Sequence, residues 1–273
     1  MPITQAILPV AGLGTRFLPW TKVVPKELLP IGNRPIIALL VDECLSVGIT
    51  DICFVISHGK EAIPQYFYQD PALEAELQRR GKHDALKELT AYDDVRFHVV
   101  YQNEMLGDGH AILQAAGWVD SDQVAILFGD DLIAGPQNGL QQLLAAYEGL
   151  PASNAEKAVL CLQNVPREMT SKYGIVDVDP GSSRLKRVKS LVEKPKPEEA
   201  PSTLGIVGKY LVPRSVFEAL PEVKSSHGGE IRLIDALIHQ LPKGLEIYGY
   251  EFEGKRLDTG TPEGYKEAVT ILG

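Results

Sequence analysis

The chain has 273 residues, of which 44% are hydrophobic and 23% are charged. This length and composition are typical of a globular protein with one large domain or two modest ones, and they exclude a low-complexity or collagen-like chain. The 36 Asp and Glu residues outnumber the 27 Lys and Arg residues, so the net charge is −9. A chain this acidic is a poor candidate for sequence-independent nucleic-acid binding, which requires an electropositive face.

The start of the chain lacks the basic and long apolar regions of a secretory signal, and no uninterrupted apolar run of about 18 residues predicts a membrane span. The three cysteines, Cys44, Cys53 and Cys161, lie in apolar segments without CxxC spacing. An odd and sparse set of this kind argues against a disulfide framework or a zinc site. We therefore expect a cytoplasmic protein without membrane contact, in which these thiols are buried.

The N-terminal half alternates strand-like and helix-like segments. Strands are expected at 5–10, 51–57, 95–101 and 123–128, and helices at 35–47, 61–67, 72–80, 83–91 and 108–117. The segment 51–57, Asp-Ile-Cys-Phe-Val-Ile-Ser, is apolar on both faces, as in a buried parallel strand. This alternation predicts a doubly wound α/β sheet.

After about residue 150, strand-like runs gather. Strands are expected at 157–164, 175–179, 185–192, 206–212 and 248–252, and helices at 215–220, 230–240 and 262–272. No linker or change of composition separates the two halves. We therefore predict one α/β domain over residues 1–273, whose later part adds mixed or antiparallel strands to the sheet.

The strongest local signal is a glycine-rich segment directly after the first strand, Ala-Gly-Leu-Gly-Thr-Arg at 11–16. Glycines there allow the backbone to approach a nucleotide and to direct N–H groups at phosphate oxygens. A dinucleotide fingerprint would need a third glycine where Phe17 stands, and none of the four Gly-Lys pairs is followed by the Ser or Thr of a P-loop. Taken alone, the segment is as compatible with an ordinary strand-to-helix turn as with a phosphate loop.

A second basic residue lies on the same connection. Lys26 stands between Pro25 and Pro30, whose fixed φ angles stiffen the loop. Arg16 and Lys26 therefore share one long loop that leaves the carboxyl end of the first strand, where open α/β sheets bind ligands. Two cations in that place suit a polyphosphate better than a hydride carrier.

Polar residues also follow later strands. The apolar run 123–128 ends in Gly129-Asp130-Asp131, and Asp258 follows another strand-like run. Mg²⁺ usually binds one or two carboxylates together with substrate phosphates, so Asp130 and Asp258 are candidate ligands, while Asp131 is equally consistent with a turn. Gln102 follows the strand 95–101 and offers both an amide donor and an acceptor, as the edge of uracil requires.

The motif at 11–30, Ala-Gly-Leu-Gly-Thr-Arg-Phe-Leu-Pro-x-Thr-Lys-x-x-Pro-Lys-Glu-Leu-Leu-Pro, resembles sugar-1-phosphate nucleotidyltransferases, most closely the bacterial members that use UTP and glucose 1-phosphate. Seven further motifs follow in the family's order, at Gln102 with 107–110, Asp130, 173–174, 193–195, 206–210, 229–235 and 258–260. The resemblance implies a Rossmann-like, mixed and mostly parallel sheet flanked by helices, with additional antiparallel strands in the C-terminal half. It also implies that residues 1–150 bind the nucleotide and residues 151–273 bind the sugar.

The resemblance implies roles for individual residues. Arg16 and Lys26 would be the catalytic cations, and Asp130 and Asp258 would bind Mg²⁺. The nucleotide would be bound by Ala11, Gly12, Gly14, Gln102, Gly107 and Asp130, and the sugar phosphate by Gly174, Glu193, Lys194 and Gly208. The implied reaction joins UTP and α-D-glucose 1-phosphate into UDP-glucose and pyrophosphate by in-line attack on the α-phosphate, in a homo-oligomer that is a dimer or a tetramer.

Two alternatives stay open at this point. Gly129-Asp130-Asp131 and Leu257-Asp258-Thr259-Gly260 are more similar to thymidylyltransferases, which use dTTP. A catalytically silent regulatory relative would be expected to lack one of the residues Arg16, Lys26, Asp130 and Asp258, and all four are present. Arg232 stands where the family has Gln.

Overall fold

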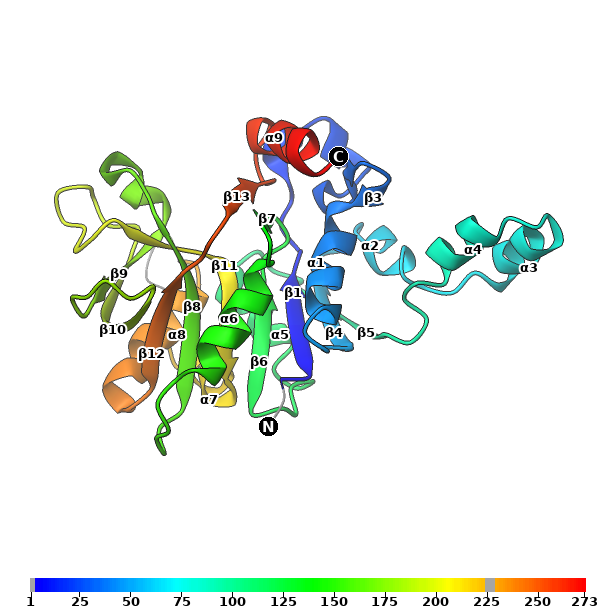
Figure 1. The fold of residues 1–273 in the computed structure, drawn as a ribbon. Helices are drawn as coiled ribbons and strands as arrows, with labels where there is room; N and C mark the ends of the chain where they lie inside the picture. The colour runs from blue at the N-terminus through cyan, green and yellow to red at the C-terminus, as the bar shows by residue number, and fades with distance from the viewer. Residues whose placement is uncertain (1–2, 224–228) are drawn as a thin grey trace.

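The computed structural model describes residues 3–223 and 229–273, which form a central sheet of nine strands in the order β5-β4-β1-β6-β11-β8-β12-β10-β9 (Figure 1). Its strands are β1 (Gln5–Pro9), β4 (Asp51–Ile56), β5 (Arg96–Tyr101), β6 (Gln123–Leu127), β8 (Lys157–Asn164), β9 (Gly174–Val178), β10 (Leu185–Glu193), β11 (Leu204–Pro213) and β12 (Glu246–Glu251). Two further pairs, β2 (Pro30–Ile31) with β3 (Arg34–Pro35) and β7 (Asp131–Ala134) with β13 (Lys255–Asp258), lie outside it.

The N-terminal half of the sheet is parallel. β1 pairs with β4 on one side and with β6 on the other, and β4 pairs with β5. All six residues of β4 are buried, as their apolar character on both faces predicts. Since these strands run in the same direction, their carboxyl ends meet at one edge of the sheet, where connecting loops can gather around a ligand.

The C-terminal half is mixed. β11 runs antiparallel to both β6 and β8, and β10 runs antiparallel to β12 and β9, whereas β12 is parallel to β8. This combination of a parallel half with later antiparallel strands confirms the predicted fold class.

Helices cover both faces of the sheet. On one face pack α1 (Ile36–Leu45) and α6 (Gly139–Glu148), and on the other α5 (Asp108–Gln114), α7 (Arg214–Ala219) and α8 (Leu233–Gln240). β1 lies between the two layers, because Ala6 and Leu8 face the first and Ile7 faces the second, with the period of two that a strand dictates. The three cysteines are free and buried, as expected.

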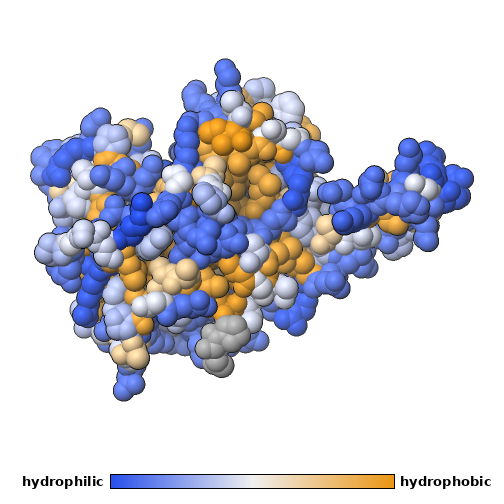
Figure 2. Space-filling model, viewed as in Figure 1, coloured by the Kyte–Doolittle hydropathy of each residue, from blue (hydrophilic) through white to orange (hydrophobic). Residues whose placement is uncertain are grey.

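The remaining helices lie at the periphery. α3 (Pro71–Arg79) and α4 (His83–Leu89) form an arm that projects from the body beyond α2 (Ala62–Gln65), and α9 (Pro262–Leu272) lies near β2 and β3 (Figure 1). Figure 2 shows that the arm is hydrophilic over most of its visible surface, while apolar side chains gather on the central body. Within 3–223 and 229–273, no helix combines the length and apolar character that crossing a bilayer requires.

Two of the elements that were not predicted from the sequence are β7 and α6. β7 has four residues, too few for a periodicity to be recognised, and it exists because it pairs with β13. α6 is set by a capping box, in which the Asn138 side chain accepts from the Gln141 backbone and the Gln141 side chain accepts from that of Asn138. The predicted helix at 230–240 begins only at Leu233, because Arg232 is extended.

Candidate functional site

A cavity of about 370 Å³ opens at the carboxyl ends of β1 and β6. All the residues predicted to bind the nucleotide line it, together with the predicted catalytic lysine: Ala11, Gly12, Gly14, Lys26, Gln102, Gly107 and Asp130. They come from three separate connections, after β1, β5 and β6, so the fold brings together what the sequence spreads over more than a hundred residues. The other predicted cation, Arg16, lies beside the cavity rather than in its wall.

The glycine-rich segment forms an open wall of this cavity. A β-carbon at Gly12 would meet no atom within 4 Å, so ligand atoms can approach the backbone there. Gly14 has a φ of +65°, a left-handed conformation that glycine adopts without strain, and its carbonyl accepts a hydrogen bond of 2.8 Å from the Thr21 hydroxyl. Directly after it, residues Thr15–Phe17 form a short 3-10 helix that carries Arg16.

Arg16 joins the glycine-rich segment to the other end of the chain. Its Nη1 donates to the carbonyl oxygen of Gly260 over 3.2 Å, in the turn that follows β13. Its positive charge also helps to lower the pKa of Asp130. The side chain therefore lies where it can contact a phosphate held between the two halves of the sheet.

Lys26 and Asp130 both line the cavity and contact each other there. Its Nζ lies 2.6 Å from Asp130 Oδ2, and only 14% of the lysine side chain is exposed. Burial disfavours the charged form of Lys26, but the carboxylates of Asp130 and Glu27 outweigh burial, so the pKa of Lys26 lies above its ordinary value. The ammonium group is therefore fully charged at neutral pH and available to a phosphate.

Asp130 and Asp258 converge on Gly260. A β-carbon at Gly260 would lie 2.7 Å from Asp130 Oδ2 and 3.0 Å from Asp258 Oδ1, so two carboxylate oxygens approach the same point. Burial would raise the pKa of Asp130, but Lys26 lowers it below its ordinary value, whereas burial and the nearby Asp131 raise the pKa of Asp258.

This donor set fits Mg²⁺, which takes one or two carboxylates and completes its shell with water and substrate phosphates. Within the part of the chain that the structure describes, no group of three or more His, Cys, Asp or Glu side chains could hold a metal ion by protein ligands alone. Asp130 and Asp258 would therefore hold the metal only together with a bound phosphate.

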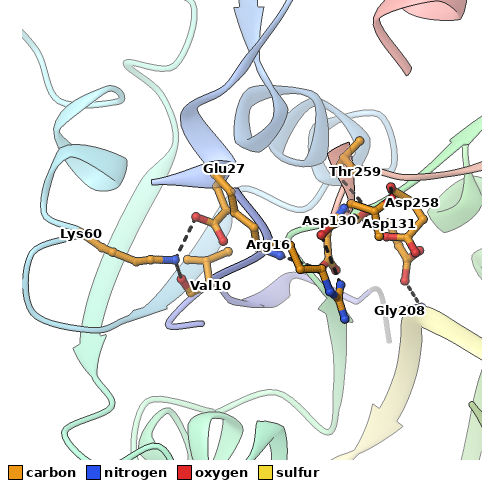
Figure 3. Close-up of polar contacts among 12 residues, drawn as sticks. Val10, Arg16, Glu27, Lys60, Asp130, Asp131, Gly208, Asp258 and Thr259 are labelled. Atoms are coloured by element: carbon orange, nitrogen blue, oxygen red, sulfur yellow. Dashed lines mark hydrogen bonds and ion pairs between the residues drawn. The ribbon is translucent and has the colours of Figure 1, made fainter. Parts of the chain in front are cut away.

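Asp131 has a different environment from its neighbour. Its Oδ1 lies 2.5 Å from Arg256 Nε, and its Oδ2 accepts a hydrogen bond of 2.8 Å from the Gly208 backbone (Figure 3). Both oxygens are thus engaged inside the protein, where they tie β7 to β13 and β11. A β-carbon at Gly208 would lie 2.6 Å from Asp131 Oδ2, which explains why the smallest residue stands there.

Gln102 and Gly107 meet on the other side of the cavity. Gln102 follows β5, and its side-chain Nε2 donates to the Gly107 carbonyl oxygen over 2.9 Å and lies 3.2 Å from His110 Nδ1. Gly107 has a φ of +106°, and a β-carbon there would lie 2.4 Å from the carbonyl oxygen of Ile231. Only glycine therefore fits this loop, which fixes the orientation of the Gln102 amide.

The predicted sugar-phosphate residues are only partly brought together. Gly174 and Glu193 are partners on β9 and β10, and both line a small second cavity of about 40 Å³. Glu193 forms ion pairs there with Arg232 and, at 3.4 Å, with Lys194, whose backbone has an unusual positive φ of 46°. Gly208, the fourth predicted residue, lies against Asp131 and does not line this cavity.

Asp108 connects the two cavities, since it lines both. Its Oδ1 accepts a hydrogen bond of 2.8 Å from the Leu233 backbone. Burial raises the pKa of Asp108 to about 6, against the lowering effect of this hydrogen bond. Asp108 was not among the predicted site residues, although its place directly after Gly107 was a usable signal.

A buried ion pair beside Lys26 was also missed. Lys60 Nζ lies 2.9 Å from Glu27 Oε2 and donates to the Val10 carbonyl oxygen over 2.6 Å (Figure 3). Only 1% of the Glu27 side chain and 9% of the Lys60 side chain are exposed. Lys60 belongs to one of the Gly-Lys pairs that are not P-loops, and its position just after the strand at 51–57 was the available signal.

Comparisons with known proteins agree with this geometry. A family model described as nucleotidyl transferase matches residues 5–272. The UTP–glucose-1-phosphate uridylyltransferase of Bacillus subtilis is 39% identical over 264 residues, which are 96% of this chain and 88% of that protein. A UTP-bound UGPase from Acinetobacter baumannii is 35% identical with a TM-score of 0.87, covering 98% of this chain and 92% of its own. A UDP-glucose pyrophosphorylase complexed with UDP-glucose is 33% identical with a TM-score of 0.86, covering 98% and 97%.

The chain therefore belongs to the nucleotidyl transferase family. Within that family it is similar to UTP–glucose-1-phosphate uridylyltransferases over nearly its whole length, which confirms both the predicted resemblance and the predicted enzyme class.

Proposed function

We propose that this protein transfers the uridylyl group of UTP to α-D-glucose 1-phosphate and releases pyrophosphate. The observation that carries the proposal is that Lys26 and Asp130 line a cavity together with the glycine-rich segment and Gln102, while Asp258 approaches Asp130 at Gly260. Such a site can hold a base at one end and a polyphosphate at the other. The similarity to relatives whose names specify UTP and glucose 1-phosphate supports these substrates.

The reaction forms one P–O bond and breaks another. An oxygen of glucose 1-phosphate attacks the α-phosphorus in line, and the bond from the α-phosphorus to the oxygen that bridges it to the β-phosphate breaks, so that pyrophosphate leaves with the electron pair. Two polyanions must approach each other, and the barrier is lowered by positioning and by charge neutralisation. No side-chain nucleophile is needed, because the sugar phosphate supplies an anionic oxygen.

Arg16 and Lys26 neutralise the triphosphate in this scheme. The Lys26 ammonium would exchange Asp130 for a phosphate oxygen when the nucleotide binds, and Arg16 would approach from the Gly260 side. Asp130 and Asp258 would hold Mg²⁺, which would supply further positive charge to the reacting phosphates. The backbone around Gly12 and Gly14 would donate N–H groups to the remaining oxygens.

The base and the sugar would bind on either side of this centre. Gln102 would pair with the uracil imide, held in place by the Gly107 carbonyl. Glu193 would bind glucose hydroxyls, and Lys194 would anchor the sugar phosphate, beside Gly174. We propose that Gly208 contributes by holding Asp131 through its backbone N–H. We also propose that residues 1–150 bind the nucleotide and residues 151–273 bind the sugar.

We further propose that the enzyme works in the cytoplasm as a dimer or a tetramer.

One observation supports dTTP as a second candidate nucleotide substrate. Gly129, which stands in the thymidylyltransferase-like motif, lines the nucleotide cavity. Thymine has the same hydrogen-bonding edge as uracil, so Gln102 alone does not distinguish the two bases.

The test is an assay of the purified protein with each nucleoside triphosphate and each common sugar 1-phosphate, with pyrophosphate release as the readout. We expect turnover with UTP and glucose 1-phosphate, and a loss of at least ~10²-fold in kcat/KM in the Lys26→Ala variant. Absence of pyrophosphate release with every pair of substrates would favour the silent regulatory relative. Full activity of the variant would remove Lys26 from the proposed mechanism.

A further inference from the structure

The buried pair of Lys60 and Glu27 lies directly behind the phosphate-binding side of the cavity. Glu27 is the neighbour of Lys26 in the chain, and Lys60 comes from the connection after β4. The Lys60 ammonium donates to Glu27 at 2.9 Å and to the Val10 carbonyl at 2.6 Å, so it bridges two segments that border the glycine-rich segment. Three separate parts of the chain are thus joined at one nitrogen atom.

Lys60 cannot be a direct phosphate ligand in this geometry. It is 7% exposed and does not line the cavity, whereas Lys26 and Glu27 both do. Its ammonium is directed toward Glu27 and Val10, which themselves line the cavity (Figure 3). Any influence of Lys60 on the reaction must therefore pass through the residues that it holds.

Packing connects this pair to the metal side of the site as well. A β-carbon at Gly129 would lie 2.6 Å from Val10 Cγ1 and 3.2 Å from Glu27 Cγ, so the Glu27 stem and the end of β1 lie tightly against the segment before Asp130. Lys26 and Asp130, which contact each other at 2.6 Å, therefore share one support.

Stability alone does not explain a pair of this kind. Removing two charges from water is costly, and a buried ion pair usually adds little stability compared with apolar side chains of the same size. Burial raises the pKa of Glu27 and lowers that of Lys60 even though the two are paired, which shows that the cost of burial is present here. What the pair supplies is a fixed position, because the Lys60 ammonium contacts both the Glu27 carboxylate and the Val10 carbonyl.

We propose that Lys60 and Glu27 are positioning residues, whose buried ion pair, anchored on the Val10 carbonyl, holds Lys26 at the triphosphate. This inference rests on the proposed role of Lys26 in the reaction. It assigns to Lys60 no contact with substrate, and it predicts that the pair matters for catalysis only while the Lys26 ammonium is present.

A double-mutant cycle tests this dependence. Lys60→Met removes the ammonium and keeps most of the stem, and it is measured in the wild type and in the Lys26→Ala variant by pyrophosphate release and by the dissociation constant of UTP. We expect Lys60→Met to lower kcat/KM for UTP by ~10–100-fold in the wild type. In the Lys26→Ala variant, we expect a further loss of less than ~3-fold, because the positioned group is already absent.

The chain offers a matched control in a second buried pair. Lys209 Nζ lies 2.6 Å from Glu43 Oε2, and both side chains are almost fully buried. Lys209→Met should lower the melting temperature, as Lys60→Met does. Any decrease in kcat/KM that it causes should be the same fold-change in the wild type and in the Lys26→Ala variant. Glu27→Gln, which keeps the shape of the side chain, takes the place of Lys60→Met in the same cycle if the latter does not fold.

The outcomes separate the two proposals. A loss from Lys60→Met or Glu27→Gln that is equal in both backgrounds, or no loss in the wild type, would overturn the positioning role. Full activity of Lys26→Ala by itself would overturn the proposed role of Lys26, and with it the basis of this inference.

Discussion

Replacing Gly260 by alanine tests whether Asp130 and Asp258 act together. The added β-carbon would lie 2.7 Å from Asp130 Oδ2, whereas ordinary contacts begin at 3.4 Å. The φ of Gly260 is in the normal range for any residue, so the substitution brings no backbone strain. The clash is with the ends of two side chains, which can move without unfolding the protein.

The expected effect follows from this displacement. Asp130 must retreat by about 0.7 Å, and the ammonium of Lys26, which contacts the same oxygen, must move with it. Since a misplacement of about 1 Å in a reacting group can cost ~10²-fold, we expect Gly260→Ala to lower kcat/KM by ~10–100-fold, or ~1.4–2.7 kcal/mol. The melting temperature should change by no more than about 3 °C.

The assay is pyrophosphate release as a function of Mg²⁺ concentration, combined with thermal unfolding. Gly117→Ala is the matched control, because a β-carbon there would meet nothing within 4 Å and its φ is also ordinary. We expect the control to have wild-type kinetics, and Gly260→Ala to require more Mg²⁺ for half-maximal rate. Unchanged rate and unchanged Mg²⁺ dependence in Gly260→Ala would refute the claim that both carboxylates serve one metal ion.

Three further predictions concern the metal, the base and pH. Excess EDTA should stop turnover, and Asp130→Ala should lower kcat/KM by ~10²–10⁴-fold, so near-normal activity in EDTA would contradict a role for Mg²⁺. UTP should be the best nucleotide and dTTP a detectable second, weaker by ~10–200-fold in competition assays, while a preference for dTTP would refute the uridylyl assignment. Because burial raises the pKa of Asp108 to about 6, its ionisation costs folding stability as the pH rises through that value. The stability gained by Asp108→Asn, measured by chemical unfolding, should therefore be larger at pH 8 than at pH 5 by ~1 kcal/mol, and a constant difference would contradict the raised pKa.

Local patterns in the sequence were sufficient for much of the fold. Apolar runs of five or six residues predict β1, β4 and β6, because a strand buried on both faces must be apolar throughout. The glycine-rich segment and the proline-bracketed Lys26 also follow from local chemistry, since the left-handed φ of Gly14 and the stiff loop are backbone properties. Short elements such as β7 escape this reasoning, because four residues carry no clear period.

The roles of adjacent aspartates could not be decided in the same way. Asp130 and Asp131 are chemically identical and follow the same strand, and only the tertiary structure separates them. The pairing of β7 with β13 brings Arg256 to Asp131 and leaves Asp130 facing Lys26. Asp130 lies in the turn after β6 and lines the cavity, whereas Asp131 begins β7 and is enclosed by its contacts with β13 and β11.

The support behind Lys26 likewise depends on contacts between distant segments. Val10, Glu27 and Lys60 are separated by many residues, and nothing in the local sequence indicates that a carbonyl, a carboxylate and an ammonium meet. Sequence determines which groups can bind phosphate, because that depends on charge and backbone freedom. Tertiary structure decides which of them reach the cavity, because burial and hydrogen-bond geometry arise only when the strands are paired.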